Sequence, residues 1–375
     1  MSASCIQFIV NLARHRLRNQ RLAGAPLDSA ADVVRWLGAV QAQDYHGAKW
    51  ALGLRMRHAT DAALDRAFDE GAFVRTHILR PTWHFVAPED LRWMLALTAP
   101  RVHAVNAARY RELELDADVL RRGHALVAGA LEGGRHLTRQ ELGGVLEAGG
   151  IAARGQRLAY LVMHAELEGL VCSGPRRGRQ LTYALLDERV PAAPVLPPDE
   201  ALAALARRYF AGHGPATVHD FAWWSGLKVS DGRRALEMIR PHVEGAVVEG
   251  KEYWTAAPSG GAAAPQPARA EAAEPVVHLL PNYDEHVVAY RDHATSCHPA
   301  ALDALYDRRE GGLDAHLVAL GGMVVGGWRR SVQKAVVAVR LNLLVPLNAH
   351  ERAALARAAD AYGRFMGLRV VVEGG

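Results

Sequence analysis

The stretch LVCSGPRRGRQLTYA, residues 170–184, decides how this chain is expected to fold. Its flanks, 170–173 and 180–184, contain β-branched and aromatic residues of the kind that favour strands. Between the flanks, residues 174–179 combine two glycines with a proline, which favours a tight reversal of the chain. The stretch therefore predicts a β-hairpin with Arg176, Arg177 and Arg179 gathered at its tip.

Two predicted helices precede this hairpin. Thr138 can cap a helix over 139–147, and the sequence 151–168 predicts a second one. Helices followed by a hairpin are typical of a winged helix-turn-helix unit. The wing of such a unit touches phosphates, so the three arginines are candidate DNA contacts. A charged hairpin tip that is merely solvated is the alternative.

The same order is expected on both sides of this unit. Upstream, we expect helices over 6–23, 30–40 and 61–70 and a strand pair over 73–80 and 81–86. Downstream, after a proline-rich segment, we expect helices over 199–212, 217–224 and 230–240 and a hairpin over 243–255. Repeated units of this kind suggest a tandem array that follows a duplex.

The end of the chain changes to β character. We expect strands over 276–280, 287–290, 317–320, 323–328 and 335–345, a helix over 350–366 and a last strand over 368–373. The predicted fold class is α+β, with tandem winged helix-turn-helix units followed by a C-terminal β-barrel-like domain. The expected divisions are winged helices at 1–90, 91–190 and 199–256, a flexible linker or insertion at 257–274, and the barrel-like domain at 275–375.

Composition narrows the class of protein. Half of the 375 residues are hydrophobic, which is enough for a large core, and no apolar run reaches the length of a membrane span, so we expect a cytoplasmic protein. Cys5, Cys172 and Cys297 are far apart, which predicts reduced thiols. The net charge of +4 is too small to establish a nucleic-acid partner. Nearly all cations are arginines, which suit phosphate contacts but also follow from a GC-rich genome.

Four stretches together carry a resemblance to a known family. They are LGAVQAQD at 37–44 with WALGL at 50–54, RTHILRPTWH at 75–84, LLPNYDE at 279–285 and YRD at 290–292. In this order they resemble the winged-helix DNA glycosylases of the AlkZ type, over nearly the whole chain. The resemblance implies three tandem winged helices and a β-barrel. It also implies an enzyme that excises alkylated bases and gives resistance to DNA-alkylating antibiotics such as azinomycin.

The resemblance places the catalytic element on Gln41 and Gln43. The family has a glutamine, one intervening residue, then glutamine or aspartate, and this chain resembles the two-glutamine branch, which is associated with bulky adducts and crosslinks. The implied substrate is double-stranded DNA carrying a bulky N7-alkylguanine, and the implied product is an abasic site. No cofactor is expected, and we expect a monomer.

Two amides suit this chemistry. Alkylation at N7 gives guanine a positive charge and makes it a good leaving group, so what remains is to place a water at the anomeric carbon. Amide carbonyl oxygens can orient that water. Asp44 beside the motif is either a supporting carboxylate or a helix-end residue. Lys49 is expected to point to solvent, which favours a monofunctional enzyme without a Schiff-base step.

Further candidates for contact with DNA or the adduct lie in the predicted strand pair: His77, Arg80, Trp83 and His84. Trp83 is more often a core aromatic than a base-stacking one. Each histidine either meets the DNA or makes structural hydrogen bonds.

Two other clusters contain side chains that could carry chemistry. Asp292, His293, Cys297 and His298 do not have the spacing of a closed metal site, so no metal is predicted. Asp284 and Glu285 could act as an acid and base, but a structural ion pair with Arg291 is the expectation, and the sequence assigns no role to Asp292.

Two other functions remain open at this point. A winged-helix transcription regulator would normally dimerise and has no evident reason to hold Gln41 beside Gln43. A protein that binds damaged DNA without cleaving it would share every pattern above. The sequence also leaves open which adduct is taken, whether crosslinks are unhooked and whether the base is flipped out of the stack.

Overall fold

The computed structural model describes residues 12–257, 275–306 and 316–374. Residues 12–19 are helical, which agrees with the helix predicted over 6–23 for the part described. Cys5 and nearly all of the predicted linker 257–274 lie outside the described residues. No helix within these ranges is long and apolar enough to cross a membrane.

The first group of elements carries the glutamine motif. Its helices and strands are α2 (Ala30–Leu37), β1 (Val40–Gln41), α3 (Tyr45–Gly53), α4 (Asp61–Asp69), β2 (Val74–Ile78) and β3 (Arg80–Val86). The strands form one antiparallel sheet in the order β1-β3-β2. Side chains of Ser29 and Thr60 cap the N-termini of α2 and α4, satisfying backbone N–H groups that have no partner within the helix.

The second group contains the hairpin that the sequence predicted. Its elements are α5 (Pro88–Glu112), α6 (Ala117–Leu131), β4 (Leu137–Thr138), α7 (Arg139–Ala148), α8 (Gly155–Leu167), β5 (Val171–Arg177), β6 (Gln180–Leu185) and α9 (Leu186–Arg189). Thr138 and Glu141 form a capping box at the start of α7. Arg177 pairs with Gln180 across a turn that contains Gly178 at φ +64°. The predicted cap and hairpin are both confirmed.

The third group also follows the predicted order. It consists of α10 (Pro198–His213), α11 (Val218–Ser225), α12 (Val229–Met238), a short 3-10 turn at Arg240–His242, and the hairpin β7 (Val243–Val248) with β8 (Lys251–Ala256). Helices followed by a hairpin thus occur three times in the described chain. The assignment of these groups as winged helices, with the boundaries given above, stays a prediction.

The C-terminal part is a curled sheet covered by a helix. Its elements are β9 (Val277–Leu280), α13 (Glu285–Val288), η2 (His293–Thr295), α14 (Pro299–Tyr306), β10 (His316–Leu320), β11 (Met323–Gln333), β12 (Val336–Leu343), α15 (Ala349–Met366) and β13 (Arg369–Glu373). The strand order is β13-β12-β11-β10-β9, so β9 and β13 are edges and the sheet does not close into a full barrel. A mixed α+β fold with a half-barrel sheet is what the structure confirms.

One predicted element is wrong. Residues 287–290 were expected to form a strand, but they lie in and just after α13. Asp284 caps this helix by accepting from the backbone N–H of His286 at 2.9 Å. An aspartate followed by a glutamate favours a helix start, and the four apolar residues at 287–290 are too few to override it.

The first and third groups share their cores with other parts of the chain. One core joins α2, α3 and α4 to the C-terminal sheet and α15. Within it, the ring of Trp50 lies 5.1 Å from that of Tyr362, and its Nε1 donates to the backbone oxygen of Leu279 at 2.6 Å. A second core joins the third group to β2 and α5, whereas α6, α7 and α8 have a core of their own. The first group is therefore held between the other parts.

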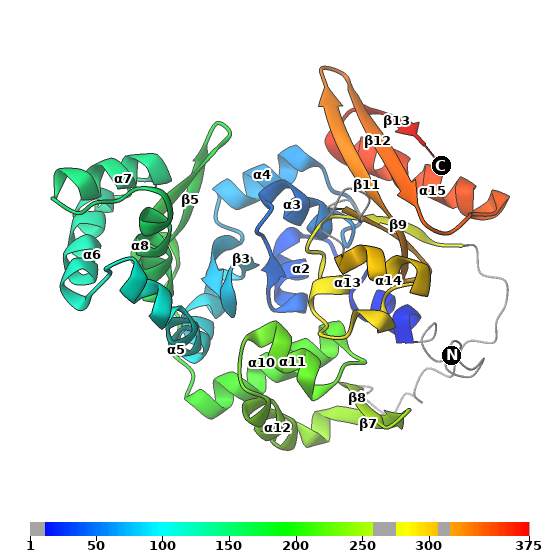
Figure 1. Ribbon diagram of the computed structural model, residues 1–375, viewed down its shortest axis with the longest axis horizontal. Coiled ribbons are helices and arrows are strands. Elements are labelled where there is room, and N and C mark those ends of the chain that lie inside the picture. The colour runs from blue at the N-terminus through cyan, green and yellow to red at the C-terminus, as the bar shows by residue number, and fades with distance from the viewer. Residues whose placement is uncertain (1–11, 258–274, 307–315, 375) are drawn as a thin grey trace.

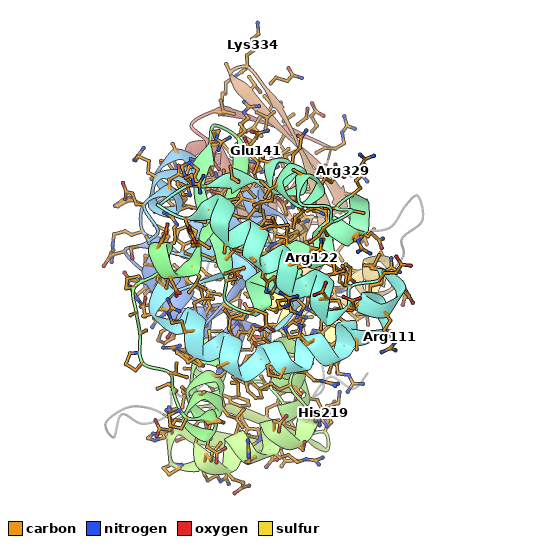
Figure 2. All side chains as sticks on the ribbon, turned by 90° about the vertical axis from the view of Figure 1, so that its left-hand side faces the viewer. Arg111, Arg122, Glu141, His219, Arg329 and Lys334 are labelled. Carbon is orange, nitrogen blue, oxygen red and sulfur yellow. The ribbon has the colours of Figure 1, made fainter. Side chains whose placement is uncertain are left out.

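The figures show how this packing shapes the molecule. In Figure 1 the second group lies to the left, the third group below and the C-terminal sheet to the upper right, with α2, α3 and α4 between them. The hairpins β5–β6 and β11–β12 both project toward the top of that view. Figure 2 shows Lys334 at the far end of the second of these hairpins and His219 in the third group near the opposite end.

Candidate active site

The two glutamines follow from strand geometry. Gln41 ends β1 and pairs with His84 of β3, and the backbone N–H of Ala42 continues the pairing by donating to the oxygen of Trp83 at 2.7 Å. Gln43 lies two residues further along the chain, just past the end of this edge strand. Both glutamines therefore lie at the β1 edge of the sheet, beside His84 and Trp83 of β3.

Gln41 is held at both its backbone and its side chain. Its backbone N–H donates to Glu285 Oε1 at 2.8 Å, and its side-chain Oε1 accepts from Arg80 Nη2 at 2.8 Å. Only 7% of the residue is exposed. A carbonyl oxygen has two lone pairs, so Arg80 leaves one of them for a further donor such as water. Gln41 is an immobilised amide with one acceptor position that no described residue occupies.

Gln43 and Asp44 are held less tightly. Gln43 is exposed, and its Oε1 lies 3.5 Å from the backbone N–H of Trp83, at the long limit of a hydrogen bond. Asp44 caps α3, because its Oδ1 accepts from the backbone N–H of His46 at 3.1 Å. The helix-end interpretation of Asp44 is thus confirmed, and its second oxygen is left for other contacts.

Gly47 allows a distant loop to reach Asp44. A Cβ atom at this position would lie 2.8 Å from Asp44 Oδ2 and 2.9 Å from Asn282 Oδ1, closer than real Cβ contacts. Asn282 belongs to the LLPNYDE stretch, and its Oδ1 is buried without a hydrogen-bond partner in the described part of the chain. The glutamine motif and that stretch therefore form one site, a contact that the sequence pattern did not indicate.

The two acids of that stretch do not pair with Arg291, which corrects the expectation. Asp284 forms a two-point ion pair with Arg55, at 3.0 Å and 2.9 Å. Glu285 Oε2 accepts from Trp224 Nε1 at 3.0 Å and lies 3.4 Å from His213 Nε2. Arg291 instead donates its backbone N–H to Asp220 at 2.9 Å. Arg55 and Trp224 are far from this stretch in sequence, so local spacing could not reveal them.

Glu285 is an ionised support beneath Gln41. Burial raises the pKa of this carboxyl, but the hydrogen bonds and charge from His213 and the N–H of Gln41 outweigh it and hold the pKa below its usual range. The side chain has no exposed surface. Glu285 therefore fixes the backbone of Gln41 and is not placed to meet a substrate.

Arg80 is positioned by the third group. Gly226, at φ +71°, ends α11 so close to Leu79 that a Cβ would lie 2.2 Å from the Leu79 backbone oxygen. This contact places the Arg80 guanidinium 5.5 Å from the ring of Trp223. Burial lowers the pKa of Arg80, although a guanidinium stays charged at neutral pH. The charge that holds Gln41 thus depends on α11.

A row of buried polar side chains crosses the sheet beside Gln41. The register pairs Gln41 with His84 and His84 with Thr76, which puts all three side chains on one face. His84 Nδ1 donates to the backbone oxygen of Thr82 at 3.0 Å, and burial lowers its pKa to about 3. His84 Nε2 and Thr76 Oγ1 have no hydrogen-bond partner among the described residues. Thr76 was missed by sequence reasoning, although strand alternation could have found it.

Comparisons with known proteins identify the family to which this site belongs. The family described as DNA glycosylase AlkZ-like matches residues 34–365, most of the chain. The chain belongs to the AlkZ-like DNA glycosylase family. The interstrand DNA cross-link repair glycosylase of Streptomyces sahachiroi is 28% identical over 229 residues, an alignment that covers 56% of this chain and 59% of the relative, less than two thirds of its length.

The fold is shared with a solved member of the family. The structure of Streptomyces sahachiroi DNA glycosylase AlkZ matches with a TM-score of 0.73 and 23% sequence identity, covering 97% of this chain and 98% of that one. At this identity the likeness shows the fold alone. The roles of individual residues in this AlkZ-like chain must therefore be argued from its own geometry.

His77 and Trp83 of this AlkZ-like chain form an internal cluster. His77 Nδ1 lies 2.5 Å from Glu166 Oε2, and Trp83 Nε1 donates to Glu166 Oε1 at 3.2 Å. The Trp83 ring lies 4.2 Å from both the His77 ring and the Arg75 guanidinium. Glu166 is buried in α8, so the cluster joins the first group to the second. Contact of these residues with DNA stays a prediction.

Lys49 does not point to solvent, which is a second correction. Its side chain is fully buried, and Nζ lies 2.7 Å from Asp61 Oδ1 and 2.6 Å from Asp65 Oδ1. The sequence did not indicate this contact because Lys49 lies on α3 and the two acids lie on α4. The acids are one helical turn apart, so they share the face of α4 that meets α3 in the folded chain. Lys49 is enclosed by carboxylates and is not presented to a substrate.

The three hairpin arginines differ from one another. Arg176 pairs with Asp65 and Asp69 of α4, each at 2.8 Å, and Arg177 pairs with Glu141 at 2.6 Å. Arg179 is exposed, and within the described residues it has no ion-pair or hydrogen-bond partner. Their contact with phosphates stays a prediction, and Arg179 is the best placed of the three.

The residues near position 292 make other contacts within the described chain. Asp292 pairs with Lys251 at 2.6 Å and caps the turn at 293–295. Cys297 is buried as a free thiol, and burial raises its pKa to about 12. Burial does the same for Cys172. Both described cysteines are thus free thiols, as the sequence predicted.

Proposed function

We propose that this chain is a monofunctional DNA glycosylase that hydrolyses the N-glycosidic bond of a bulky N7-alkylguanine in double-stranded DNA. The observation that carries the proposal is the fixed Gln41 amide, held by Arg80 and Glu285 beside Gln43, in a chain of the AlkZ-like family. Hydrolysis of a cationic adduct requires water placement more than a strong acid, and two amides supply that placement.

The reaction balances without a cofactor. Water oxygen forms a bond to the anomeric carbon, and the bond from that carbon to guanine N9 breaks. The bonding electrons leave with the base and neutralise the positive charge that N7 alkylation put on the ring. The water proton passes to solvent or to Asp44, whose second carboxylate oxygen is not used in capping α3.

The burial of Lys49 supports the monofunctional form of the proposal. A glycosylase that also cuts the backbone needs an accessible amine to form a Schiff base. Lys49 is the lysine nearest the motif in sequence, and Asp61 and Asp65 enclose its amine. The product is therefore an intact strand with an abasic site.

The finer substrate follows from the two-glutamine motif. Gln43 is exposed and only Gln41 is buried, so the motif lies at the edge of a sheet and not in a deep cavity. An open site of this kind accommodates a bulky adduct, including one arm of an interstrand crosslink. Unhooking such adducts would protect a cell against a DNA-alkylating antibiotic. We further propose that the protein acts as a monomer.

The test is a single-turnover assay on a duplex with one defined N7-alkylguanine. Released base is measured by mass spectrometry, and strand cleavage is measured before and after hot alkali. We expect free modified base, and strand cleavage only after alkali. Binding to the damaged duplex without release of the base would indicate a damage-binding protein. Binding that depends on DNA sequence and is equally tight on undamaged DNA would indicate a transcription regulator. Strand cleavage without alkali would refute the monofunctional assignment.

A further inference from the structure

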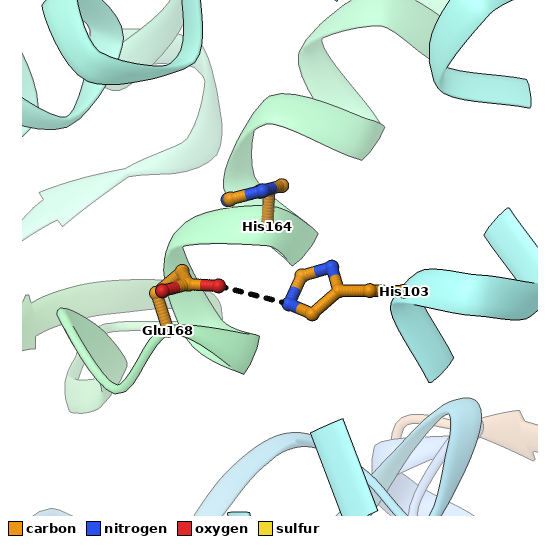
Figure 3. Close-up of side chains that lie close together, drawn as sticks. All are labelled: His103, His164 and Glu168. Atoms are coloured by element: carbon orange, nitrogen blue, oxygen red, sulfur yellow. Dashed lines mark ion pairs between the residues drawn. The ribbon is translucent and has the colours of Figure 1, made fainter. Parts of the chain in front are cut away.

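Helices α5, α6 and α8 bring three histidines and a glutamate together on the second group. His103 lies on α5 and His164 on α8, while Glu168 is the C-cap of α8 (Figure 3). His124 lies on α6. His164 and Glu168 are four residues apart, so one helical turn places them on the same face. None of these residues takes part in the glutamine site.

The atoms that could bind a metal ion converge. One ligand atom each from His103, His164 and Glu168 lies within 4.8 Å of the others, and His103 Nε2 is 3.0 Å from Glu168 Oε1. Nitrogen and oxygen ligands about 2.0–2.2 Å from a tetrahedral zinc ion are roughly 3.4 Å apart. A shift of the exposed Glu168 carboxylate by about an ångström would bring the ligand atoms closer to that spacing.

Both histidines are oriented through their other ring nitrogen. His103 Nδ1 lies 2.9 Å from the Tyr110 hydroxyl, and His164 Nδ1 lies 3.2 Å from His124 Nε2. With Nδ1 engaged, His103 is left with Nε2, the nitrogen that faces Glu168, as its ligand atom. Histidines that bind metals are typically held in this way by an outer hydrogen bond.

The surroundings of His103 suit a ligand. Its ring is largely buried and faces the half-exposed carboxylate of Glu168. His103 Nε2 is buried and makes no hydrogen bond of acceptable angle within the described structure, although Glu168 is close to it. An ion between the two groups would satisfy that nitrogen.

We propose that His103, His164 and Glu168 bind a divalent transition-metal ion. Two imidazoles and a carboxylate are ligands that zinc accepts, and water would complete a four-coordinate site. Half of the Glu168 side chain is exposed (51%), so an ion can enter from solvent. The ion would join α5 to α8, and α8 also carries Glu166, which contacts His77 and Trp83. Its role is to stabilise this helix pair, and base release does not pass through it.

The competing explanation is simple packing of aromatic rings. The His164 ring centroid lies 4.6 Å from that of His103 and 5.0 Å from that of His124. Such a cluster would stabilise the helices without any ion. The two explanations differ in metal content, which can be measured directly.

The experiment uses the full chain without a histidine tag, freed of metal by chelator and then titrated with zinc chloride. We expect about one zinc per chain by elemental analysis after desalting, and visible absorption of four-coordinate cobalt when cobalt replaces zinc. The variants His103→Gln and His164→Gln should lose this zinc. The control His219→Gln, an exposed histidine outside the cluster, should keep it.

A second variant separates ligands from their outer partners. His124→Phe keeps a ring at that position but removes the acceptor for His164, so zinc affinity should fall by about 10- to 100-fold without being abolished. Circular dichroism of each variant checks that the chain is folded. The proposal is overturned if the folded wild type binds no more zinc than the His103→Gln/His164→Gln double variant.

Discussion

The side-chain oxygen of Gln41 has one lone pair directed to Arg80 and a second that no described residue uses. If the free position orients the attacking water, Gln41→Ala and Gln43→Ala should each slow base release by about 10²- to 10⁴-fold with little change in DNA affinity. The double variant should lose less than the product of the two effects, because the same water cannot be misplaced twice. Single-turnover rates and duplex binding are the measurements.

Asp44→Asn is the counter-test for this assignment. The amide keeps the acceptor oxygen that caps α3 but removes the charge, so the helix should survive. A modest effect on base release is expected if solvent takes the proton. Loss of all excision in Asp44→Asn, with near-normal rates in both glutamine variants, would make Asp44 the base and contradict the role given to the glutamines.

Arg80 has two possible roles: its guanidinium positions the Gln41 amide, or it contacts a DNA phosphate. Arg80→Met keeps much of the side-chain length but cannot hold the amide, so the rate should fall by about 10²-fold while the salt dependence of binding stays unchanged. Arg364→Met, on the exposed face of α15, is the control and should change neither quantity. A reduced salt slope in Arg80→Met would show that Arg80 contacts the DNA backbone.

At the scale of elements, α4 explains why the hairpin arginines are not equivalent. Its acids Asp61, Asp65 and Asp69 face Lys49 and Arg176, so one helix face collects charges from α3 and from the β5–β6 hairpin. The side chain of Arg176 is only 18% exposed. The Arg176 charge joins the second group to the first through its ion pairs with α4, and these pairs compete with any contact to phosphate.

This arrangement predicts different effects for two arginines of one hairpin, one on DNA binding and one on stability. Arg179→Ala should weaken binding to all duplexes and lower the salt slope by about one unit, as loss of a phosphate contact does. Arg176→Ala should instead reduce the free energy of unfolding by about 1.5–3 kcal/mol, because hydrogen bonds to charged groups are lost. Salt-dependent binding and urea unfolding of both variants separate the effects. An unchanged slope in Arg179→Ala would place this hairpin away from DNA.

At the scale of the whole molecule, the Arg55–Asp284 pair joins the first group to the C-terminal part of the chain. Arg55 also donates to the backbone oxygens of Gln20 and Ala51, so it connects the N-terminal helix, α3 and the start of α13. Both side chains are almost fully buried. Arg55→Met should destabilise the protein by about 3–5 kcal/mol, since it leaves a buried carboxylate without its partner. A loss below about 1 kcal/mol in urea unfolding would show that the pair is not needed.

The same pair predicts a dependence of stability on pH. Burial raises the pKa of Asp284, but the charge and hydrogen bonds of Arg55 outweigh this and hold the pKa below its usual range. Because the folded pKa is below the unfolded value of about 3.9, the contribution is present above about pH 4 and is lost as the pH falls through the folded pKa. Between pH 5 and pH 3 the wild type should lose more stability than an Arg55→Met/Asp284→Leu variant. Parallel losses in the two proteins would argue against this.

Much of the element order was determined by local sequence. The Thr138 cap, the glycine turn at 178 and the apolar spacing of α10 and α15 depend on residues within a few positions of one another, so they could be predicted without the fold. The strand expected at 287–290 is wrong because another local signal is stronger. The Asp284 cap starts a helix at Glu285, and four apolar residues do not override it. Gln41 and Gln43 were named only through the resemblance to a known family, and their catalytic role stays a prediction.

The partners of these residues were decided only by tertiary structure. Glu285, Arg80 and Trp224 meet around Gln41 from three separate parts of the chain, and Asp61 and Asp65 enclose Lys49 from another helix. A buried charge must find an opposite charge or a hydrogen bond, because an unpaired one is too costly. The sequence shows only that such charges exist. Which of them meet depends on how the first group is enclosed by the second, the third and the C-terminal sheet, and that information resides in contacts between residues far apart in sequence.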